Sequence, residues 1–123
     1  KFMEEMTAMT ITRYKTGARM SQAVVHNDTV YLAGQVADDG GADVGGQTEQ
    51  VVAKIDGLLA DAGTDKSKLL SATIWITDIT AFNQMNAVWD AWVSPGNTPA
   101  RACVQATLAA PQYKVEIAIV AAL

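Results

Sequence analysis

Two stretches near the C-terminus decide the fold: residues 100–108, ARACVQATL, and residues 113–123, YKVEIAIVAAL. In both, apolar side chains occupy every second position, which is the period of a β-strand. A turn at residues 109–112 would join the two strands as an antiparallel hairpin with its apolar set packed under helices. The other set, which includes Arg101 and Glu116, is then expected on the opposite face. The apolar set comprises Ala102, Val104, Ala106, Leu108, Val115, Ile117 and Ile119.

Toward the N-terminus the pattern predicts a second hairpin. Residues 22–27 and 29–36 are β-branched or apolar runs that meet at Asn27 and Asp28, two residues that favour turns. Residues 11–14 are a candidate further strand. The glycines and aspartates that follow, DDGGADVGG, are typical of a loop.

The middle of the chain predicts two helices around a central strand. Residues 48–62 repeat apolar side chains at helical spacing, with Thr48 placed to cap the helix and Gly63 placed to end it. Residues 69–79 are rich in isoleucine and other strand formers. A second amphipathic helix begins at Thr80 and ends at a Ser-Pro-Gly stop.

The predicted order β-β-α-β-α-β-β describes an α+β fold with two helices on one face of a sheet. The uncovered face still carries Cys103, Ala118 and Val120, and apolar surface of that kind normally meets a partner, so we expect an oligomer. Residues 1–8 have no clean period and are expected to be an arm, a tag or a leader, with Met9 as an alternative start. Residues 9–123 are expected to form a single domain.

Composition excludes several partners. The chain has 123 residues, 50% of them hydrophobic, and a net charge of −4. That charge has the wrong sign for gripping nucleic acid or an anionic membrane, and no apolar run approaches the ~18 residues of a membrane span. We therefore expect neither nucleic acid nor membrane as a partner. With one cysteine and no secretory core at its start, the chain is expected to be cytoplasmic.

Most catalytic motifs are missing. His26 is the only histidine and has no nucleophile motif nearby, which argues against a Ser-His-Asp triad. One histidine and one cysteine fall short of a zinc site, and the glycine-rich loop lacks the lysine of a phosphate loop, so we expect no metal and no cofactor. Cys103 is expected to be a small buried side chain rather than a nucleophile. Core packing is expected for Trp75, Trp89 and Trp92.

Arg101 and Glu116 remain as candidate site residues. An arginine grips a carboxylate with two hydrogen bonds and a glutamate can move a proton or hold a water, so the pair suits a small carboxylate substrate. In the predicted hairpin Glu116 lies opposite Thr107, which is ~20 Å from Arg101. If they share a site, Arg101 of one subunit must face Glu116 of another. The alternative is a rim ion pair for Arg101 and a solvated strand position for Glu116.

At these residues the sequence resembles the Rid (reactive intermediate deaminase, or YjgF) family. Residues 98–117, TPARACVQATLAAPQYKVEI, are similar to its signature, a Pro-Ala-Arg-Ser/Ala-Cys-Val opening with an Ile/Val-Glu-Ile/Met close. AGQVA at residues 33–37 is similar to the family's Ser-Gly-Gln-Ile/Val segment. TDITAFNQMNAVWDAW at residues 77–92 is similar to its helix with Asp, Phe, Asn and an aromatic residue. The resemblance covers about residues 17–121.

The resemblance implies a chorismate-mutase-like fold with a mixed sheet, a homotrimer with clefts between subunits, and hydrolysis of 2-imino or enamine acids to 2-keto acids and ammonia. Arg101 would bind the substrate carboxylate, and Glu116 would position or activate the attacking water. The backbone of Cys103 would contact the imine or the water, and Gly34 would supply a further backbone contact. Asn86 corresponds to the family's helix asparagine near the cleft.

Two substrate-contacting positions depart from the family pattern. Met20 stands where the best-known deaminases have a tyrosine, and Ala33 stands where the family has a serine, so two hydroxyls are absent. These departures favour an alternative, a trimeric metabolite-binding or regulatory protein that holds a small carboxylate without turnover. Arg19, beside Met20, could suit another carboxylate, although a solvated arginine is the simpler expectation. Endoribonuclease activity, attributed to some relatives, conflicts with the net charge of −4.

Overall fold

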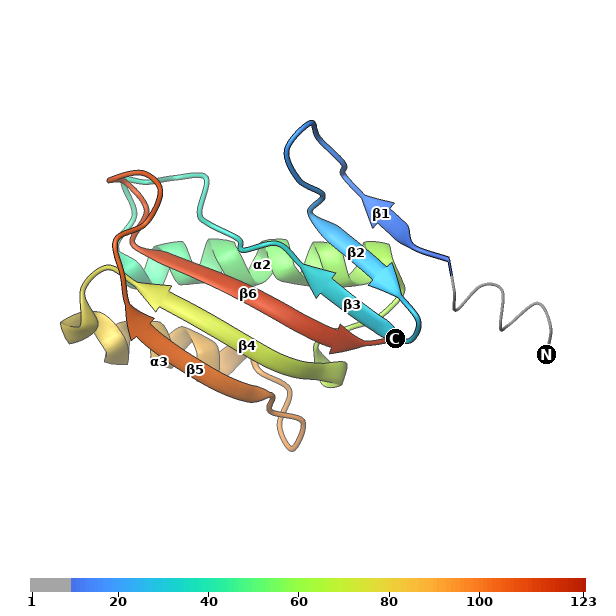
Figure 1. The fold of residues 1–123 in the computed structure, drawn as a ribbon. Coiled ribbons are helices and arrows are strands. Elements are labelled where there is room, and N and C mark those ends of the chain that lie inside the picture. The colour runs from blue at the N-terminus through green and yellow to red at the C-terminus, as the bar shows by residue number, and fades with distance from the viewer. Residues whose placement is uncertain (1–9) are drawn as a thin grey trace.

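The computed structural model describes residues 10–123, so the prediction for residues 1–8 lies outside the described part of the chain. Six strands form one mixed sheet in the order β1-β2-β3-β6-β4-β5 (Figure 1). The strands are β1 (Thr12–Tyr14), β2 (Ala23–His26), β3 (Thr29–Leu32), β4 (Leu69–Ile76), β5 (Ala100–Gln105) and β6 (Val115–Ala122). The helices are α2 (Val44–Ala62), α3 (Phe82–Trp92) and the short 3-10 turns η1 (Lys66–Lys68) and η2 (Ile79–Ala81).

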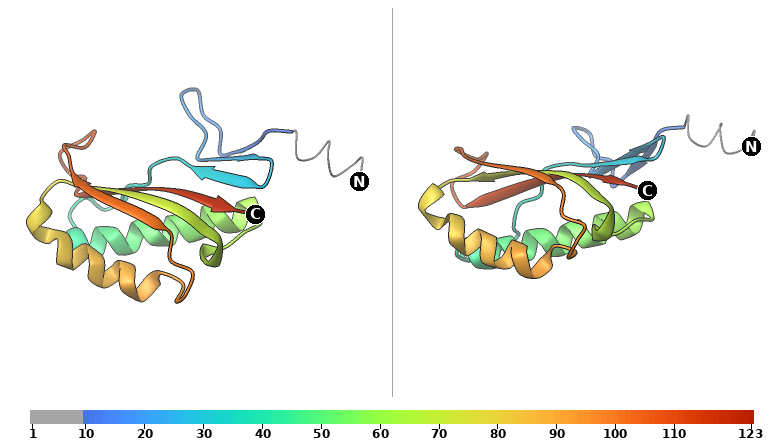
Figure 2. Two further views of the ribbon diagram at one scale, coloured as in Figure 1. Left: turned by 60° about the horizontal axis from the view of Figure 1, so that its bottom comes forward. Right: turned by 90° about the horizontal axis from the view of Figure 1, so that it is seen from below.

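Both α-helices lie on one face of the sheet and leave the other face uncovered, as Figure 2 shows. α2 packs on β2, β3 and β6 and also against α3. The core lies between the two layers, and its largest fully buried apolar side chains are Ile55, Leu59, Ile74, Ile76, Met85, Ile117 and Ile119. The predicted α+β architecture with two helices on one face is therefore confirmed.

Helix α2 begins four residues earlier than predicted. Asp43 rather than Thr48 is the N-cap, because its Oδ1 accepts a hydrogen bond from the backbone N of Gly46 at 2.8 Å. Thr48 is buried inside the helix and its Oγ1 donates to the carbonyl of Val44 at 2.7 Å. The end of the helix agrees with the prediction, since Gly63 adopts the left-handed conformation at φ 88°.

The predicted hairpin of β2 and β3 is present. His26 pairs with Thr29 across the turn, and Asn27 there has a positive φ of 55°. The candidate N-terminal strand is β1, which pairs antiparallel with β2. β4 ends at Ile76, earlier than predicted, and Asp78 then caps η2 by accepting from the backbone N of Thr80 at 2.9 Å.

The predicted hairpin of the last two strands is wrong. β4 lies between them, parallel to β5 and antiparallel to β6. Arg101 is level with Ala72, whose side chain is buried under the helices, whereas Glu116 is level with Trp75 on the uncovered face. Neighbouring residues in register point to the same face of a sheet. Arg101 and Glu116 therefore lie on opposite faces and not, as predicted, on one.

The same register corrects the predicted faces of β5. Cys103 is level with the buried Ile74 and belongs to the helix-covered side, not to the bare face. Val104, predicted to pack under the helices, lies on the uncovered face and is 47% exposed. Tyr31 and Val120, which are level with each other on β3 and β6, lie on that face too. The uncovered face is thus apolar in part: Ala118 and Val120 lie on it as predicted, Cys103 does not, and Val104 and Tyr31 are added to it.

Candidate functional site

Arg101 lies on the edge strand β5, and its guanidinium group is held by α3. Nη1 donates a hydrogen bond to Oδ1 of Asn86 at 2.8 Å. The guanidinium carbon lies 5.8 Å from the ring centre of Phe82 and 5.4 Å from that of Trp89. Arg101 is exposed, and its side chain makes no other hydrogen bond within residues 10–123, so the remaining N–H donors of the guanidinium group can bind an anion.

Cys103 follows on the same side of β5. Its side chain is half-buried against the core, as expected for a small apolar residue. Burial raises the pKa of the Cys103 thiol, and the charge of Arg101 opposes this with a smaller effect. Because only the thiolate is a nucleophile, this environment makes Cys103 less reactive than a free cysteine.

We expect iodoacetamide to modify Cys103 with a pH profile whose midpoint lies above that of the same thiol in the urea-unfolded chain. The raised pKa leaves a smaller thiolate fraction in the folded protein at any pH near neutrality. Mass spectrometry of timed aliquots measures both profiles. A folded-state midpoint at or below the unfolded one would show that Arg101 outweighs burial at this position.

Glu116 lies on β6 at the uncovered face, close to the backbone of Gly34. A Cβ atom added at Gly34 would lie 2.9 Å from Cδ and 3.2 Å from Cγ of Glu116, and would collide with its Oε2. No side chain fits at position 34 while the carboxylate keeps its place. The structure thus brings Gly34 to Glu116 and Asn86 to Arg101, and it keeps these two pairs on opposite faces of the sheet.

Gln35 fixes the segment that carries Gly34, and the sequence reasoning did not single it out. Its backbone N donates to the carbonyl of Ile117 at 2.9 Å, next to Glu116 on β6. Its side chain is 6% exposed, and Nε2 donates to Oε1 of Gln22 and to the carbonyl of Ala33, both at 2.9 Å. The sequence could have pointed to Gln35, because a side-chain amide inside the apolar run LAGQVA is expected to be buried and a buried amide needs hydrogen-bond partners.

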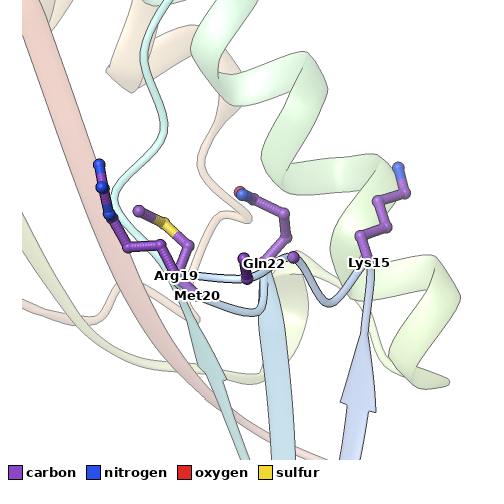
Figure 3. Close-up of a pocket in the computed structure, with 6 residues that line it drawn as sticks. Lys15, Arg19, Met20 and Gln22 are labelled. Atoms are coloured by element: carbon purple, nitrogen blue, oxygen red, sulfur yellow. The ribbon is translucent and has the colours of Figure 1, made fainter.

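Met20 lies on the loop between β1 and β2, is 53% exposed and adjoins two cavities. The first, of about 560 Å³, lies within the loop (Figure 3) and is lined by Lys15, Gly17, Ala18, Arg19, Met20 and Gln22. The second, of about 520 Å³, shares Lys15, Met20 and Gln22 with it and extends to Gly34 and Gln35. The loop therefore presents a thioether beside Gly34, and the half-buried Ala33 adds only a methyl group.

The three tryptophans divide between the two faces. Trp89 and Trp92 are buried and pack in the core, as predicted. Trp75 is half-buried on the uncovered face, in register with Glu116 on one side and Val104 on the other. Its prediction as a core residue is wrong, and it becomes an aromatic neighbour of the carboxylate.

Away from these residues, two ion pairs lie within the described residues 10–123. Lys54 pairs with Asp38 at 2.7 Å, and Lys15 pairs with Asp61 at 3.8 Å.

Within residues 10–123 the His, Cys, Asp and Glu side chains form no group of three that could hold a metal ion. No helix in this part of the chain combines the length and apolar character needed to cross a membrane.

Known proteins of one family match this sequence over most of its length. The family model for Endoribonuclease L-PSP matches residues 10–123. RutC family protein YoaB of Escherichia coli (strain K12) is 48% identical over 115 residues, which cover 94% of this chain and 100% of that protein. A RutC family protein of Haemophilus ducreyi is 44% identical over 92% of this chain and 97% of its own length. The crystal structure of NMB1025, a YjgF family member from Neisseria meningitidis, has a TM-score of 0.91 at 45% identity, covering 94% and 96%.

The mixed sheet, the two helices and these relatives define an α+β protein of chorismate-mutase-like fold. The chain belongs to the Rid (YjgF) family, as the resemblance at residues 98–117 predicted. The names of these relatives state a family and no substrate, so a reaction has to rest on the residues of the site.

Proposed function

We propose that this protein hydrolyses reactive 2-imino and enamine acids to 2-keto acids and ammonia at clefts between the subunits of a homotrimer. One observation carries the proposal: a single chain presents two incomplete halves of a site. Arg101 offers unused N–H donors on one side of the sheet, and Glu116 lies against Gly34 on the other. Arg101 alone can hold a carboxylate and Glu116 alone can hold a water, so a second copy supplies the missing half.

The proposed chemistry needs only these groups. Arg101 binds the substrate carboxylate with two hydrogen bonds and so fixes the imine carbon, which is already electrophilic once the imine is protonated. The oxygen of a water bonds to that carbon while Glu116 accepts a proton from the water. Glu116 then returns the proton to the nitrogen. As the C–N bond breaks, the O–H electrons form the keto C=O bond, the hydroxyl proton passes to the Glu116 carboxylate, and ammonia leaves the keto acid. Backbone groups of Gly34 and Cys103 would contact the imine or the water.

The uncovered sheet face supports assembly from several copies. It presents apolar side chains, including Tyr31 and Val104, each 47% exposed, and surface of this kind normally meets a partner. Because the two halves of the site lie on different faces, the contact that joins them pairs unlike surfaces. Repeated contacts between unlike surfaces form a ring when the rotation from one copy to the next closes, and a trimer is such a ring.

Mixing two inactive variants tests the shared site. We expect Arg101→Ala and Glu116→Ala each to be inactive alone, and a mixture refolded together to regain about a quarter of wild-type activity, since random assortment pairs intact halves at one interface in four. The keto acid formed per minute is measured after co-refolding. As a control, the two variants are refolded separately and then mixed briefly. A co-refolded mixture that stays inactive would contradict a site between subunits.

The function itself is tested with imines generated in place. An amino-acid oxidase or a threonine dehydratase produces 2-iminopropanoate or 2-iminobutanoate, and semicarbazide traps the imine that remains. We expect the wild-type protein to divert the flux from semicarbazone to keto acid.

The alternative, a trimeric protein that binds a small carboxylate without turnover, is favoured by the missing hydroxyls at Met20 and Ala33. It predicts no effect on semicarbazone formation together with a melting temperature that rises with added keto acid. The two assays therefore separate hydrolysis from binding.

A further inference from the structure

One face of α3 surrounds the guanidinium of Arg101. Phe82, Asn86 and Trp89 are spaced at i, i+4 and i+7, so their side chains share a stripe along the helix. Asn86 accepts the single hydrogen bond, and the two aromatic rings lie 5.8 Å and 5.4 Å from the guanidinium carbon. A cation at such distances from a ring is attracted by the electrons of the ring face.

The rings are themselves anchored to the rest of the fold. Trp89 is 4% exposed and lies against Trp92, with ring centres 5.3 Å apart and planes tilted by 57°. Trp92 donates from Nε1 to Oδ2 of Asp56 on α2 at 3.0 Å, and Nζ of Lys66 lies 5.5 Å from its ring centre. The group that holds Arg101 therefore extends through two tryptophans to the neighbouring helix and to η1.

We infer that Phe82 and Trp89 are positioning residues, which hold the Arg101 guanidinium in one orientation so that its unused N–H donors are ready for the substrate carboxylate. This inference rests on the proposed function. Arginine is long and flexible, and one that is free in solvent must lose that freedom when it binds a ligand. Here folding has already ordered the side chain, although the residue is exposed.

Phe82→Leu is the primary test because Phe82 is only half-buried, so the substitution keeps an apolar side chain and removes the ring. We expect KM for the imine and Kd for the keto acid to rise about two- to fivefold, the range of an exposed cation–ring contact, with kcat nearly unchanged. Val88→Ala is the matched control: Val88 is also half-buried on α3, yet it lines the groove between the helices. It should leave KM at the wild-type value.

Two further variants separate positioning from general stability. Trp89→Phe keeps a ring and should stay within about twofold of the wild-type KM, whereas Trp89→Leu should behave like Phe82→Leu. In an Arg101→Lys background Phe82→Leu should change Kd less than it does in wild type, because its effect passes through the planar guanidinium. An equal effect in both backgrounds, or a wild-type KM in Phe82→Leu, would overturn the inference.

A readout that needs no substrate keeps this test apart from that of the function. Nitrogen-15 relaxation of the Arg101 Nε–H group should show an ordered side chain in wild type and in Val88→Ala, and a mobile one in Phe82→Leu. If wild type neither hydrolyses imines nor binds keto acids, the proposed function fails. The relaxation data on Arg101 still decide whether Phe82 orders its side chain. Equal mobility in wild type and Phe82→Leu would refute the positioning role even in an active enzyme.

Discussion

Replacing Arg101 with alanine should lower kcat/KM for 2-iminobutanoate at least about 100-fold, since two hydrogen bonds to a charged group are lost together. The remaining charged group of the site, Glu116, repels a carboxylate and cannot replace the arginine. The keto acid should also stop raising the melting temperature, because binding depends on the same contact. Steady-state kinetics and thermal melts with added keto acid measure the two effects.

The variant should fold. Arg101 is exposed on an edge strand, and its one hydrogen bond, to Asn86, lies near the surface. A circular dichroism spectrum and a melting temperature close to those of wild type are therefore expected. Arg19→Ala is a useful control. It removes an equal charge from the loop that lines the first cavity and leaves the Arg101 guanidinium in place. Equal rates for Arg101→Ala and wild type would remove Arg101 from the mechanism.

The second large effect is expected from Gly34→Ala, which should lower kcat by about 30-fold or more. The new methyl group and the Glu116 side chain cannot occupy the same space, so the carboxylate must swing away from its place. A displacement of the general base on this scale is enough to lose most of its contribution, which is typically about 10²- to 10⁴-fold. The change is expected in kcat more than in KM, because Gly34→Ala does not alter Arg101, which binds the carboxylate of the substrate.

Once Glu116 is replaced by alanine, Gly34→Ala should raise the free energy of unfolding. Gly34 has no positive φ, so its backbone accepts alanine, and alanine at such a site stabilises by about 0.4–1 kcal/mol. Glu116→Ala combined with Gly34→Ala should thus be more stable than Glu116→Ala alone, and no less active than it. Gly57→Ala on α2 is the matched control: nothing lies within 4 Å of its added Cβ, so it should stabilise the helix without changing kcat. Loss of activity in Gly34→Ala with Glu116 undisturbed in a crystal structure would contradict this account.

Periodicity predicted the helices and strands because each pattern is local. The alternation in β6 and the helical stripe of α2 record which side of each element meets the core. The start of α2 was hidden because Gly45 and Gly46 are typical of loops, although the cap at Asp43 allows them in the first turn. Residues that favour a turn in isolation can be helical when a neighbour satisfies the backbone.

Strand pairing could not be predicted in the same way. Alternation tells which residues of one strand share a face, but it does not tell which strand lies beside it. The apolar β6 takes a central place, and β5, with Arg101, Cys103 and Gln105 on its inner side, takes the edge. An edge position lets a long arginine lie on the covered side and still reach solvent past α3.

The residues of the proposed site come from the sequence, whereas their arrangement comes from the structure. Arg101 and Asn86 form one group, and Glu116 and Gly34 form the other, each from strands or segments distant in sequence. The proposal that a second copy completes the site now rests on the two faces of the sheet instead of a distance along a hairpin. Trp75 was assigned to the core and Gln35 was not singled out, because their positions depend on the register of β4 and β6 and on the bridge from Gln35 to Ile117.

Positions 34 and 116 are coupled through space, so that a change at one affects the other. Nothing in the backbone conformation at position 34 demands glycine, so the requirement for it comes from the neighbouring acid. A bulkier residue there forces the long side chain on β6 to move away. If Glu116 acts as proposed, the absence of a side chain at position 34 keeps room for an acid on another strand and answers no need of the local backbone.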